Sequence, residues 1–150
     1  MTPTDNVRAF FAARGETVRS DASFLVAGKI TLSGDTIKPG LAGEPTCYNG
    51  KAYTPSNQLT PGRTSYGANN NIRILRYADV LLMNAEAKIR KGQNGDAEIN
   101  QVRERAKLAP LTGATLDQLL DERRAEFAME WGERFFDLVR TDKAAGTLPG

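Results

Sequence analysis

The chain has 150 residues, of which 40% are hydrophobic and 25% charged, and its net charge at pH 7 is +2. These values are typical of one ordinary globular domain, and so small a charge does not favour nucleic acid or an anionic membrane as a partner. Histidine is absent and Cys47 is the single cysteine. The composition therefore excludes an internal disulfide, a Ser-His-Asp or Cys-His pair, and any imidazole-bound or multi-thiolate metal site.

The first part of the chain, residues 1–71, is rich in Gly, Pro, Thr, Ser and Asn and has little hydrophobic periodicity. A short helix is predicted over residues 5–14, because Val7, Phe10 and Phe11 fall on one side of such a helix. Residues 1–19 contain polar and charged residues where a secretory signal needs an apolar core, which taken alone indicates a cytoplasmic protein.

A weak β-hairpin is predicted over residues 24–37, with strands at 25–26 and 29–32 and a turn near 33–35. Proline and glycine then recur from residue 38 to residue 71, and regular elements are not expected there. A loop of this length is seldom structureless in a compact domain unless it is functional or lies against a larger body.

The second part, residues 72–150, is predicted to be helical. A first helix over 76–90 and a second over 96–107 are joined by a short Gly-containing turn, and the second has acidic residues at its start and basic residues at its end, which complements the helix dipole. The predicted buried faces consist of Ala78, Leu81, Leu82, Ala85 and Ile89 in the first helix and Ile99, Val102 and Ala106 in the second.

The third predicted helix begins with a capping box, in which Thr115 is the N-cap and Gln118 reaches back to it. Gly132 interrupts this helix, and a final helix follows over 133–140. The predicted core-facing side chains are Leu116, Leu120, Phe127, Trp131, Phe135, Phe136, Leu138 and Val139. Short connections predict antiparallel helical hairpins, loosely similar to tetratricopeptide pairs although no 34-residue repeat is present.

Three helical segments resemble consecutive signature blocks of the SusD/RagB family: residues 72–87, 100–106 and 122–140. Residues 48–51, Tyr-Asn-Gly-Lys, are similar to a stretch that precedes the first block in that family. Residues 5–8, Asp-Asn-Val-Arg, occupy the place of a family Asp-Pro-Arg segment but lack its proline. The resemblance is firm over the latter half of the chain, and family members are several-fold longer.

The resemblance implies a mainly α fold in which C-terminal antiparallel hairpins follow a loop-rich segment. It also implies a non-catalytic surface lipoprotein of the outer membrane that captures oligosaccharides or similar nutrients for a SusC-like TonB-dependent transporter. The lipid anchor of such a protein lies outside these 150 residues. No cofactor and no metal is implied for this chain.

Asp79 and Glu86 share one face of the first predicted helix and admit two interpretations. They are either the acid/base pair of a glycosidase or partners of arginines on neighbouring helices, such as Arg105 or Arg124. The many arginines in the adjacent blocks favour ion pairing, because a guanidinium can hold two partners at once. The predicted structural ion network contains Asp79, Glu86, Arg105, Arg124, Glu126, Arg134 and Asp137.

Ligand contacts are predicted at the loop tyrosines Tyr48, Tyr53 and Tyr66, because a sugar presents flat C–H faces that stack on aromatic rings. The main alternative function is a helical-hairpin adaptor that binds peptides in a groove without being exported. An enzyme is the third hypothesis. The absence of histidine, of a P-loop and of a GxGxxG motif argues against most common chemistries, but a carboxylate-only glycosidase is compatible with it.

Overall fold

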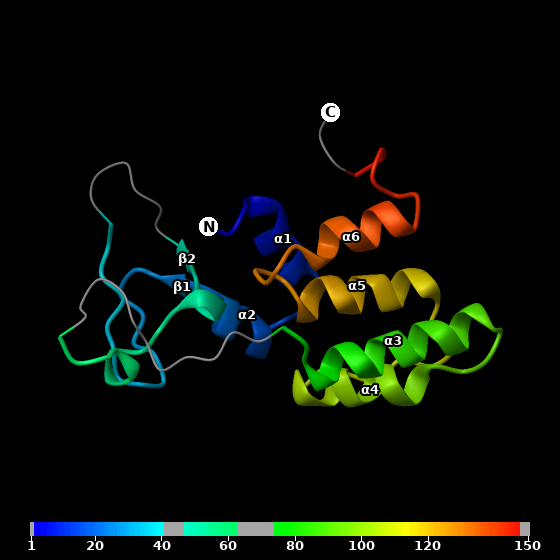
Figure 1. Cartoon of the computed structure of the whole chain (residues 1–150), viewed down its shortest axis with the longest axis horizontal. Helices are drawn as coiled ribbons and strands as arrows, with labels where there is room; N and C mark the ends of the chain where they lie inside the picture. Colours follow the sequence, from blue (N-terminus) through cyan, green and yellow to red (C-terminus); the bar gives the residue numbers. More distant parts are fainter. Residues whose placement is uncertain (1, 41–46, 63–73, 148–150) are drawn as a thin grey trace.

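The computed structural model describes residues 2–40, 47–62 and 74–147 and contains two unlike parts. A group of helices forms one part, and a loop-rich lobe with a two-stranded sheet extends from it (Figure 1). The elements are α1 (Asp5–Ala13), α2 (Val18–Ser23), β1 (Phe24–Val26), β2 (Cys47–Asn49), the 3-10 helices η1 (Gly50–Ala52) and η2 (Ser56–Gln58), α3 (Tyr77–Arg90), α4 (Asp96–Arg105), α5 (Leu116–Glu126) and α6 (Glu133–Arg140). The predicted mainly α fold is confirmed.

Helices α3 and α4 form the first antiparallel hairpin, at nearly the predicted positions. Leu82 and Ala85 of α3 and Ile99 of α4 are fully buried, as their spacing predicted. The connection is tight at Gly95, where an added Cβ would lie 2.8 Å from the carbonyl oxygen of Ala85. A side chain at residue 95 would therefore force the two helices apart.

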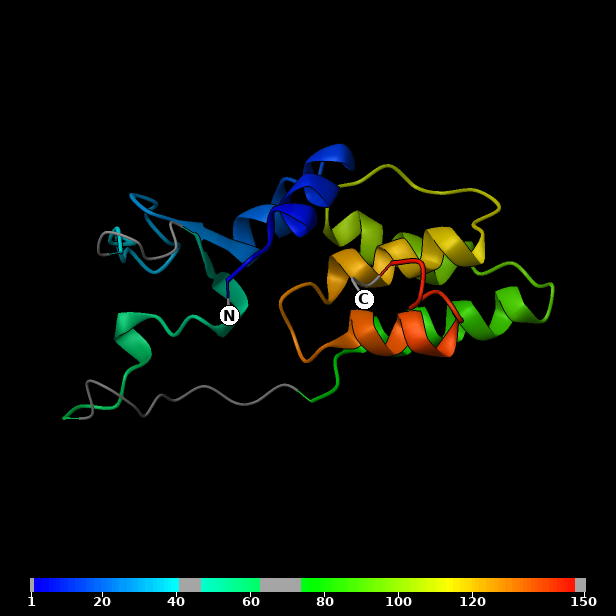
Figure 2. The same cartoon turned by 90° about the horizontal axis from the view of Figure 1, so that it is seen from above.

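Helix α5 lies between the α3–α4 hairpin and the helices α1 and α6 (Figure 1). Seen from above, α5 overlaps α4 and α6 overlaps α3 (Figure 2). The predicted capping box is present: the Gln118 N–H donates to Thr115 Oγ1 at 3.3 Å, and the Thr115 N–H donates to Gln118 Oε1 at 2.9 Å. The predicted continuation of this helix to Trp131 is wrong. It ends at Glu126, because Met129 adopts a left-handed backbone with φ of 66°.

Helix α6 does not bury the face that carries its aromatic residues, although the sequence predicted that this face is in the core. Leu138 is only 2% exposed, as expected, and Phe127 before the helix is buried as well. The inward face carries Asp137, which is ion-paired with Arg123 of α5 at 2.9 Å. These charged contacts occupy the interface, so apolar neighbours on α6 point outward. The prediction of burial is wrong for side chains that are between 49% and 67% exposed: Trp131, Phe135, Phe136 and Val139.

A second apolar cluster joins α1 to α5 and to the sheet. Phe11 is 1% exposed and meets the Phe24 ring edge-on, with 4.9 Å between the ring centroids. Ala125 of α5 and Cys47 of β2 complete the contact. The thiol of Cys47 is buried in apolar surroundings, which agrees with an inert cysteine rather than a reactive one.

The strand partner predicted for residues 25–26 is wrong. β1 pairs with β2 in an antiparallel sheet that places Leu25 opposite Tyr48. The chain turns at Gly28, whose φ is 85°, and the segment after it pairs within itself: the Gly28 N–H donates to the Ile37 carbonyl oxygen at 2.8 Å, and the Ile37 N–H donates to the Lys29 carbonyl oxygen at 2.8 Å. Residues 28–37 instead form a narrow loop of their own, closed by a bridge between Ile30 and Thr36.

Short elements also occur where none was predicted. β2, η1 and η2 lie inside the stretch 38–71, and η1 starts where Asn49 Oδ1 accepts the N–H groups of Lys51 and Ala52 at 2.9 and 3.3 Å. The short helix α2 was missed because its six residues are too few to show a helical hydrophobic period. The expectation of an irregular segment is therefore too broad.

Candidate functional site

Two of the three candidate tyrosines lie in the loop-rich lobe, defined here as residues 24–37 and 47–59. Tyr48 is half-buried on β2, and Tyr53 is half-buried directly after η1. The hydroxyl of Tyr53 donates a short hydrogen bond to Asp35, so the ring face is the part left for a ligand. Tyr66 lies outside the described residues.

Asp35 fixes the narrow loop of the lobe to the segment that carries Tyr53. Its carboxylate accepts the N–H of Ser56 at 2.9 Å and also the Ser56 hydroxyl. The hydrogen bonds from Ser56 and then from Tyr53 hold the pKa of Asp35 below its ordinary value. Burial, followed by the hydrogen bond to Asp35, raises the pKa of Tyr53. The tyrosine is thus held in place beside an ionised carboxylate.

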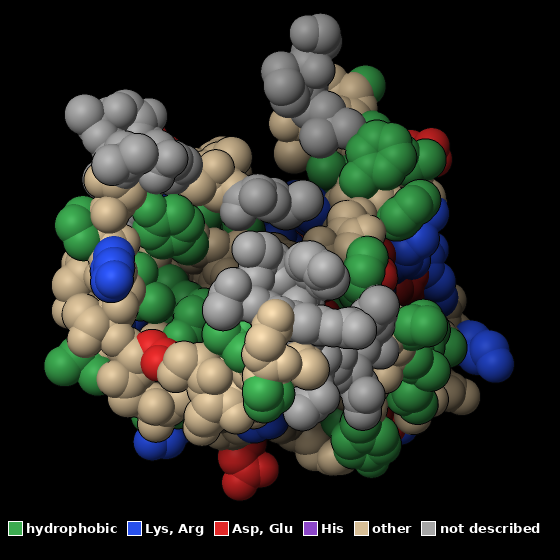
Figure 3. Space-filling model, turned by 60° about the vertical axis from the view of Figure 1, so that its left-hand side comes forward, with side chains coloured by type: hydrophobic (Ala, Val, Ile, Leu, Met, Phe, Trp, Pro, Cys, Tyr) green, Lys and Arg blue, Asp and Glu red, His purple; other side chains and the backbone are tan. Residues whose placement is uncertain are grey.

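The lobe also has an exposed apolar surface that the sequence did not reveal (Figure 3). Val26 is 43% exposed, Ile30 is 67% exposed and Leu59 is 41% exposed, and Leu32 projects fully into solvent. Exposed apolar side chains that gather on one part of a protein often mark a contact surface. Their aliphatic character is visible in the sequence, but their exposure depends on how the loop folds.

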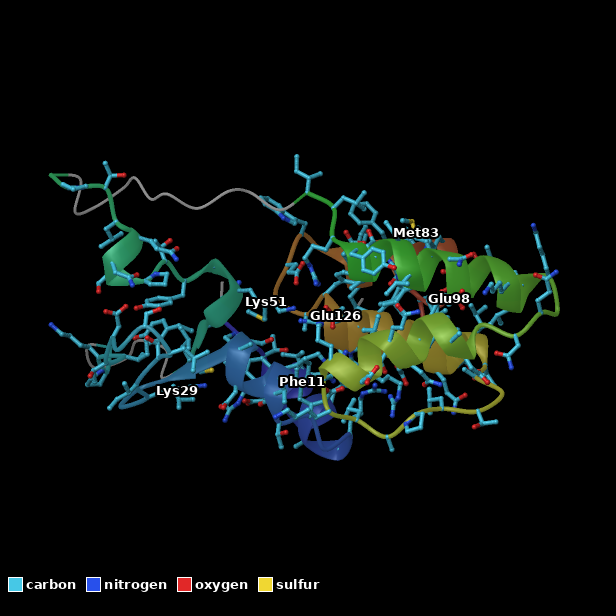
Figure 4. All side chains as sticks on the ribbon, turned by 90° about the horizontal axis from the view of Figure 1, so that it is seen from below. Phe11, Lys29, Lys51, Met83, Glu98 and Glu126 are labelled. Carbon is cyan, nitrogen blue, oxygen red and sulfur yellow. The ribbon has the colours of Figure 1, made fainter. Side chains whose placement is uncertain are left out.

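Two polar side chains attach the lobe to the end of α5. The ammonium of Lys51 donates to the Glu126 carbonyl oxygen at 2.5 Å and to Glu130 Oε1 at 2.7 Å, and Figure 4 shows Lys51 beside Glu126. Asn49 Nδ2 donates to the carbonyl oxygen of Met129 at 2.8 Å. Burial lowers the pKa of Lys51, against the opposing effect of the Glu130 hydrogen bond. The lobe is consequently positioned by the helices.

Behind this attachment lies a buried set of ion pairs, which we call the central network. Glu126 is 1% exposed, and its carboxylate binds Arg76 at 2.7 Å and Arg105 at a shorter distance. Glu122 is fully buried one turn earlier. The network contains Arg14, Glu16, Arg19, Lys51, Arg76, Arg103, Arg105, Glu122, Glu126 and Glu130.

A second set of ion pairs, the outer network, joins α3, α5 and α6. Its members are Asp79, Glu86, Arg90, Arg123, Glu133, Asp137 and Arg140. Arg123 binds Asp79 at 2.8 Å and Asp137 at 2.9 Å, so one guanidinium links three helices. The partners proposed for Asp79 and Glu86 were Arg105 or Arg124, whereas the structure supplies Arg123 and Arg140.

These contacts bear on the glycosidase alternative, because a general acid needs a raised pKa. Arg140 binds both oxygens of Glu86, and Arg90 binds one of them at 2.8 Å. The Arg140 hydrogen bonds lower the pKa of Glu86. Asp79 is likewise engaged by Arg123. The two carboxylates act as ion-pair partners, and Glu86, with its lowered pKa, is not poised to donate a proton.

Two members of the predicted ion network differ from the rest. Among the described residues, neither Arg124 nor Arg134 has a carboxylate within ion-pair distance. Arg124 instead donates to Asn6 Oδ1 at 2.6 Å. Conversely, the sequence analysis missed Arg19, Lys51 and other members of the central network. The pairs that link Arg19 to Glu126 and Lys51 to Glu130 span more than seventy residues, so no helical spacing could have identified those two pairs.

Among the described residues, no group of side chains is a candidate metal cluster, and no helix has the length and hydropathy of a membrane span. The surface of the described part contains shallow recesses. One recess of about 290 Å³ between α3 and α4 and another of about 250 Å³ near α4 and α5 are lined by arginines of the central network. Neither includes a candidate tyrosine. The lobe surface is therefore the better candidate for ligand contact.

The chain is similar to known proteins along most of its length. The model of the SusD family matches residues 31–149. A SusD-like protein of Bacteroides ovatus is 33% identical over 145 residues, which is 83% of this chain and 24% of that protein. SusD-like protein P38 of Formosa agariphila is 40% identical over 93 residues, which is 52% of this chain and 18% of that protein.

Solved structures agree with this assignment. Surface glycan-binding protein A from Bacteroides uniformis matches with a TM-score of 0.70 and 30% identity, over 98% of this chain and 30% of its own. Its counterpart from Bacteroides thetaiotaomicron matches with a TM-score of 0.73 and 29% identity, over 95% of this chain and 32% of its own. The chain thus spans about a third or less of these proteins. The sequence and the fold together establish that it belongs to the SusD family.

Proposed function

We propose that this chain forms the helical frame and part of the ligand surface of a non-catalytic glycan-binding protein that serves nutrient uptake. The observation that carries the proposal is the structural likeness to two surface glycan-binding proteins over 95% or more of the chain. Mechanistically, an oligosaccharide is captured and released with no bond made or broken. Engagement of Asp79 and Glu86 by arginines supports this, because both carboxylates are held in ion pairs and the lowered pKa of Glu86 does not suit a general acid.

The proposed contact surface is the loop-rich lobe. Tyr48 and Tyr53 offer ring faces for sugar C–H groups, and exposed side chains such as Ile30 extend the apolar surface. Tyr66 belongs to the same proposal on its sequence position. The attachment through Lys51 holds the lobe in place before the ligand arrives, which lowers the entropic cost of binding.

A glycan array probed with the chain, followed by calorimetry on the strongest ligand, tests this surface. Tyr53→Ala is expected to weaken binding about tenfold because the stacking ring is lost. Tyr53→Phe keeps the ring and removes only the hydroxyl bonded to Asp35, so it serves as the matched control and should bind within about twofold of the unaltered chain. Equal affinities for all three proteins would rule out Tyr53 as a contact.

The location and the transporter partner are also proposals, supported by membership of the SusD family. The parent protein is expected at the outer-membrane surface, where it delivers its ligand to a SusC-like TonB-dependent transporter. Affinity purification of the parent protein from solubilised outer membranes should recover that transporter. Recovery of the parent protein from the cytosol, without a transporter, would contradict both proposals and favour the adaptor.

A further inference from the structure

The recess of about 290 Å³ between α3 and α4 lies at one end of their hairpin. The two helices are antiparallel and lie side by side (Figure 1), so the first residue of α3, Tyr77, comes close to the last residue of α4, Arg105, and both line the recess. Pockets for small ligands have volumes of about 300–1,000 Å³. A recess near the lower end of this range suits one sugar ring.

The recess combines an apolar lining with an exposed aromatic ring. Val102 is 2% exposed, and Leu81 packs against the hydrophobic core, so both belong to the stable part of the hairpin. Tyr77 is 71% exposed, and among the described residues its hydroxyl has no hydrogen-bond partner. The fold therefore makes little use of this tyrosine, and its ring face is available to the C–H groups of a sugar.

Two planar polar side chains of α4 complete the lining. Gln101 is exposed, and the described part of the chain supplies no partner for its amide, which can both donate and accept hydrogen bonds. The side chain of Arg105 is 63% exposed, and its Nη2 donates to Glu126. Its Nε and Nη1 make no hydrogen bond to a described residue, so they remain as donors for a ligand.

Glu126 fixes the arginines of the recess before a ligand arrives. Its Oε1 accepts from Arg105 Nη2 and, at 2.7 Å, from Arg76 Nη1, so the two guanidinium groups meet at one oxygen atom. Its carbonyl oxygen accepts from Arg76 Nη2 at 3.0 Å and from the ammonium of Lys51 at 2.5 Å. The recess therefore borders the attachment of the loop-rich lobe. Because both guanidinium groups already contact a carboxylate, their remaining N–H donors suit hydroxyl groups without requiring a charged ligand.

We infer that this recess binds one neutral pyranose ring of a glycan, an inference that rests on the proposed glycan-binding function. Such a ring has an apolar C–H face and hydroxyl groups around its edge. Tyr77 and the apolar lining receive the face, and Gln101 and Arg105 bind the hydroxyl groups. The recess is then a second sugar contact beside the lobe, and one oligosaccharide can reach both.

D-Glucose, D-galactose, D-mannose and D-xylose are the neutral probes, and D-glucuronate is the charged counterpart of glucose. Each is titrated at constant ionic strength into the methyl-labelled chain, and the methyl signals of Leu81 and Val102 are followed by NMR, because both side chains line the recess. At least one neutral sugar should shift these signals saturably. Tyr77→Ala should weaken that binding about tenfold, because the stacking ring is lost. Gln101→Ala should weaken it about threefold to tenfold, because hydrogen bonds are lost.

Phe135→Ala and Gln93→Ala are the matched controls, because they remove an aromatic ring and an amide from exposed positions outside the recess and should leave the affinity unchanged. If Tyr77→Ala loses its helical circular dichroism, Gln101→Ala still tests the site. Signals that no neutral sugar moves, signals that glucuronate alone moves, or an affinity unaltered by the Gln101 change would overturn the inference. Glycan binding that Tyr53→Ala weakens would leave the proposed function intact, whereas binding of no glycan would contradict that function as well.

Discussion

The fully buried carboxylate of Glu122 joins three separate parts of the chain. It lies 2.6 Å from Arg14 after α1, 2.8 Å from Arg19 in α2 and 2.8 Å from Arg103 in α4. The side chain of Arg19 is 5% exposed and that of Arg103 is 12% exposed. Glu122→Gln keeps the shape of the side chain but removes a charge that three guanidinium groups share. Arg14 and Arg19 still contact Glu16, whereas Arg103 loses the carboxylate that it contacts.

Removing one partner of a buried ion pair costs about 3–5 kcal/mol of unfolding free energy, because the remaining charge stays desolvated. For a chain of this length, that loss lowers the melting temperature by roughly 10 °C. The measurement is urea unfolding followed by circular dichroism, with the free energy extrapolated linearly to water. An unchanged slope against urea would show that the variant loses stability and not compactness.

Asp117→Asn makes the same chemical change on the same helix and is the matched control. Asp117 pairs with Lys143, but their side chains are 73% and 43% exposed, so this pair contributes at most about 1 kcal/mol. Glu122→Gln should therefore be the less stable variant by at least about 2 kcal/mol. Equal stabilities within about 0.5 kcal/mol would refute the claim that the central network fixes α1, α2 and α4 on α5.

Two further predictions concern packing and pH. Gly95→Ala should lower the unfolding free energy by about 1–3 kcal/mol, because the added Cβ would press on the Ala85 carbonyl oxygen. Gly146→Ala is the control: its Cβ meets open space, so the unfolding free energy should change little. Equal losses in the two variants would contradict the tight contact at Gly95. The Glu86 pKa is lowered by Arg140, so the stability from this pair is complete above the unfolded-state pKa near 4.5 and is lost as pH falls through the folded-state value. Unfolding measured from pH 6 to pH 3 should accordingly show a smaller acid loss in Glu86→Gln, and an unchanged loss would contradict the pairing.

The parts of the fold that depend on residues close together in the sequence were predictable. The capping box of Thr115 and Gln118 involves side chains three residues apart, and the buried face of α3 follows from helical spacing. Strand pairing was not predictable in this way. Leu25 pairs with Tyr48, more than twenty residues away, and no local turn determines that register.

Ion pairs between residues far apart in the sequence were not predictable either. The sequence indicated that Asp79 and Glu86 are ion-pair partners, because arginines fill the neighbouring blocks, but it could not assign Arg123 and Arg140 to them. The outward position of Phe135 was missed for a related reason. Helical spacing defines two faces of α6, and only the ion pairs made by other helices determine which one is buried. The exposed aliphatic surface of the lobe likewise depends on tertiary structure.

Calorimetry with the strongest ligand from the array, followed by chromatography of the recovered ligand, is the most direct test of capture without catalysis. The account predicts saturable binding to the chain, a weaker interaction with Tyr53→Ala, and an oligosaccharide recovered at its original length. Shorter products that disappear in Asp79→Asn or Glu86→Gln would contradict the account and restore the glycosidase. Absence of binding to every glycan would contradict the proposed contact surface itself.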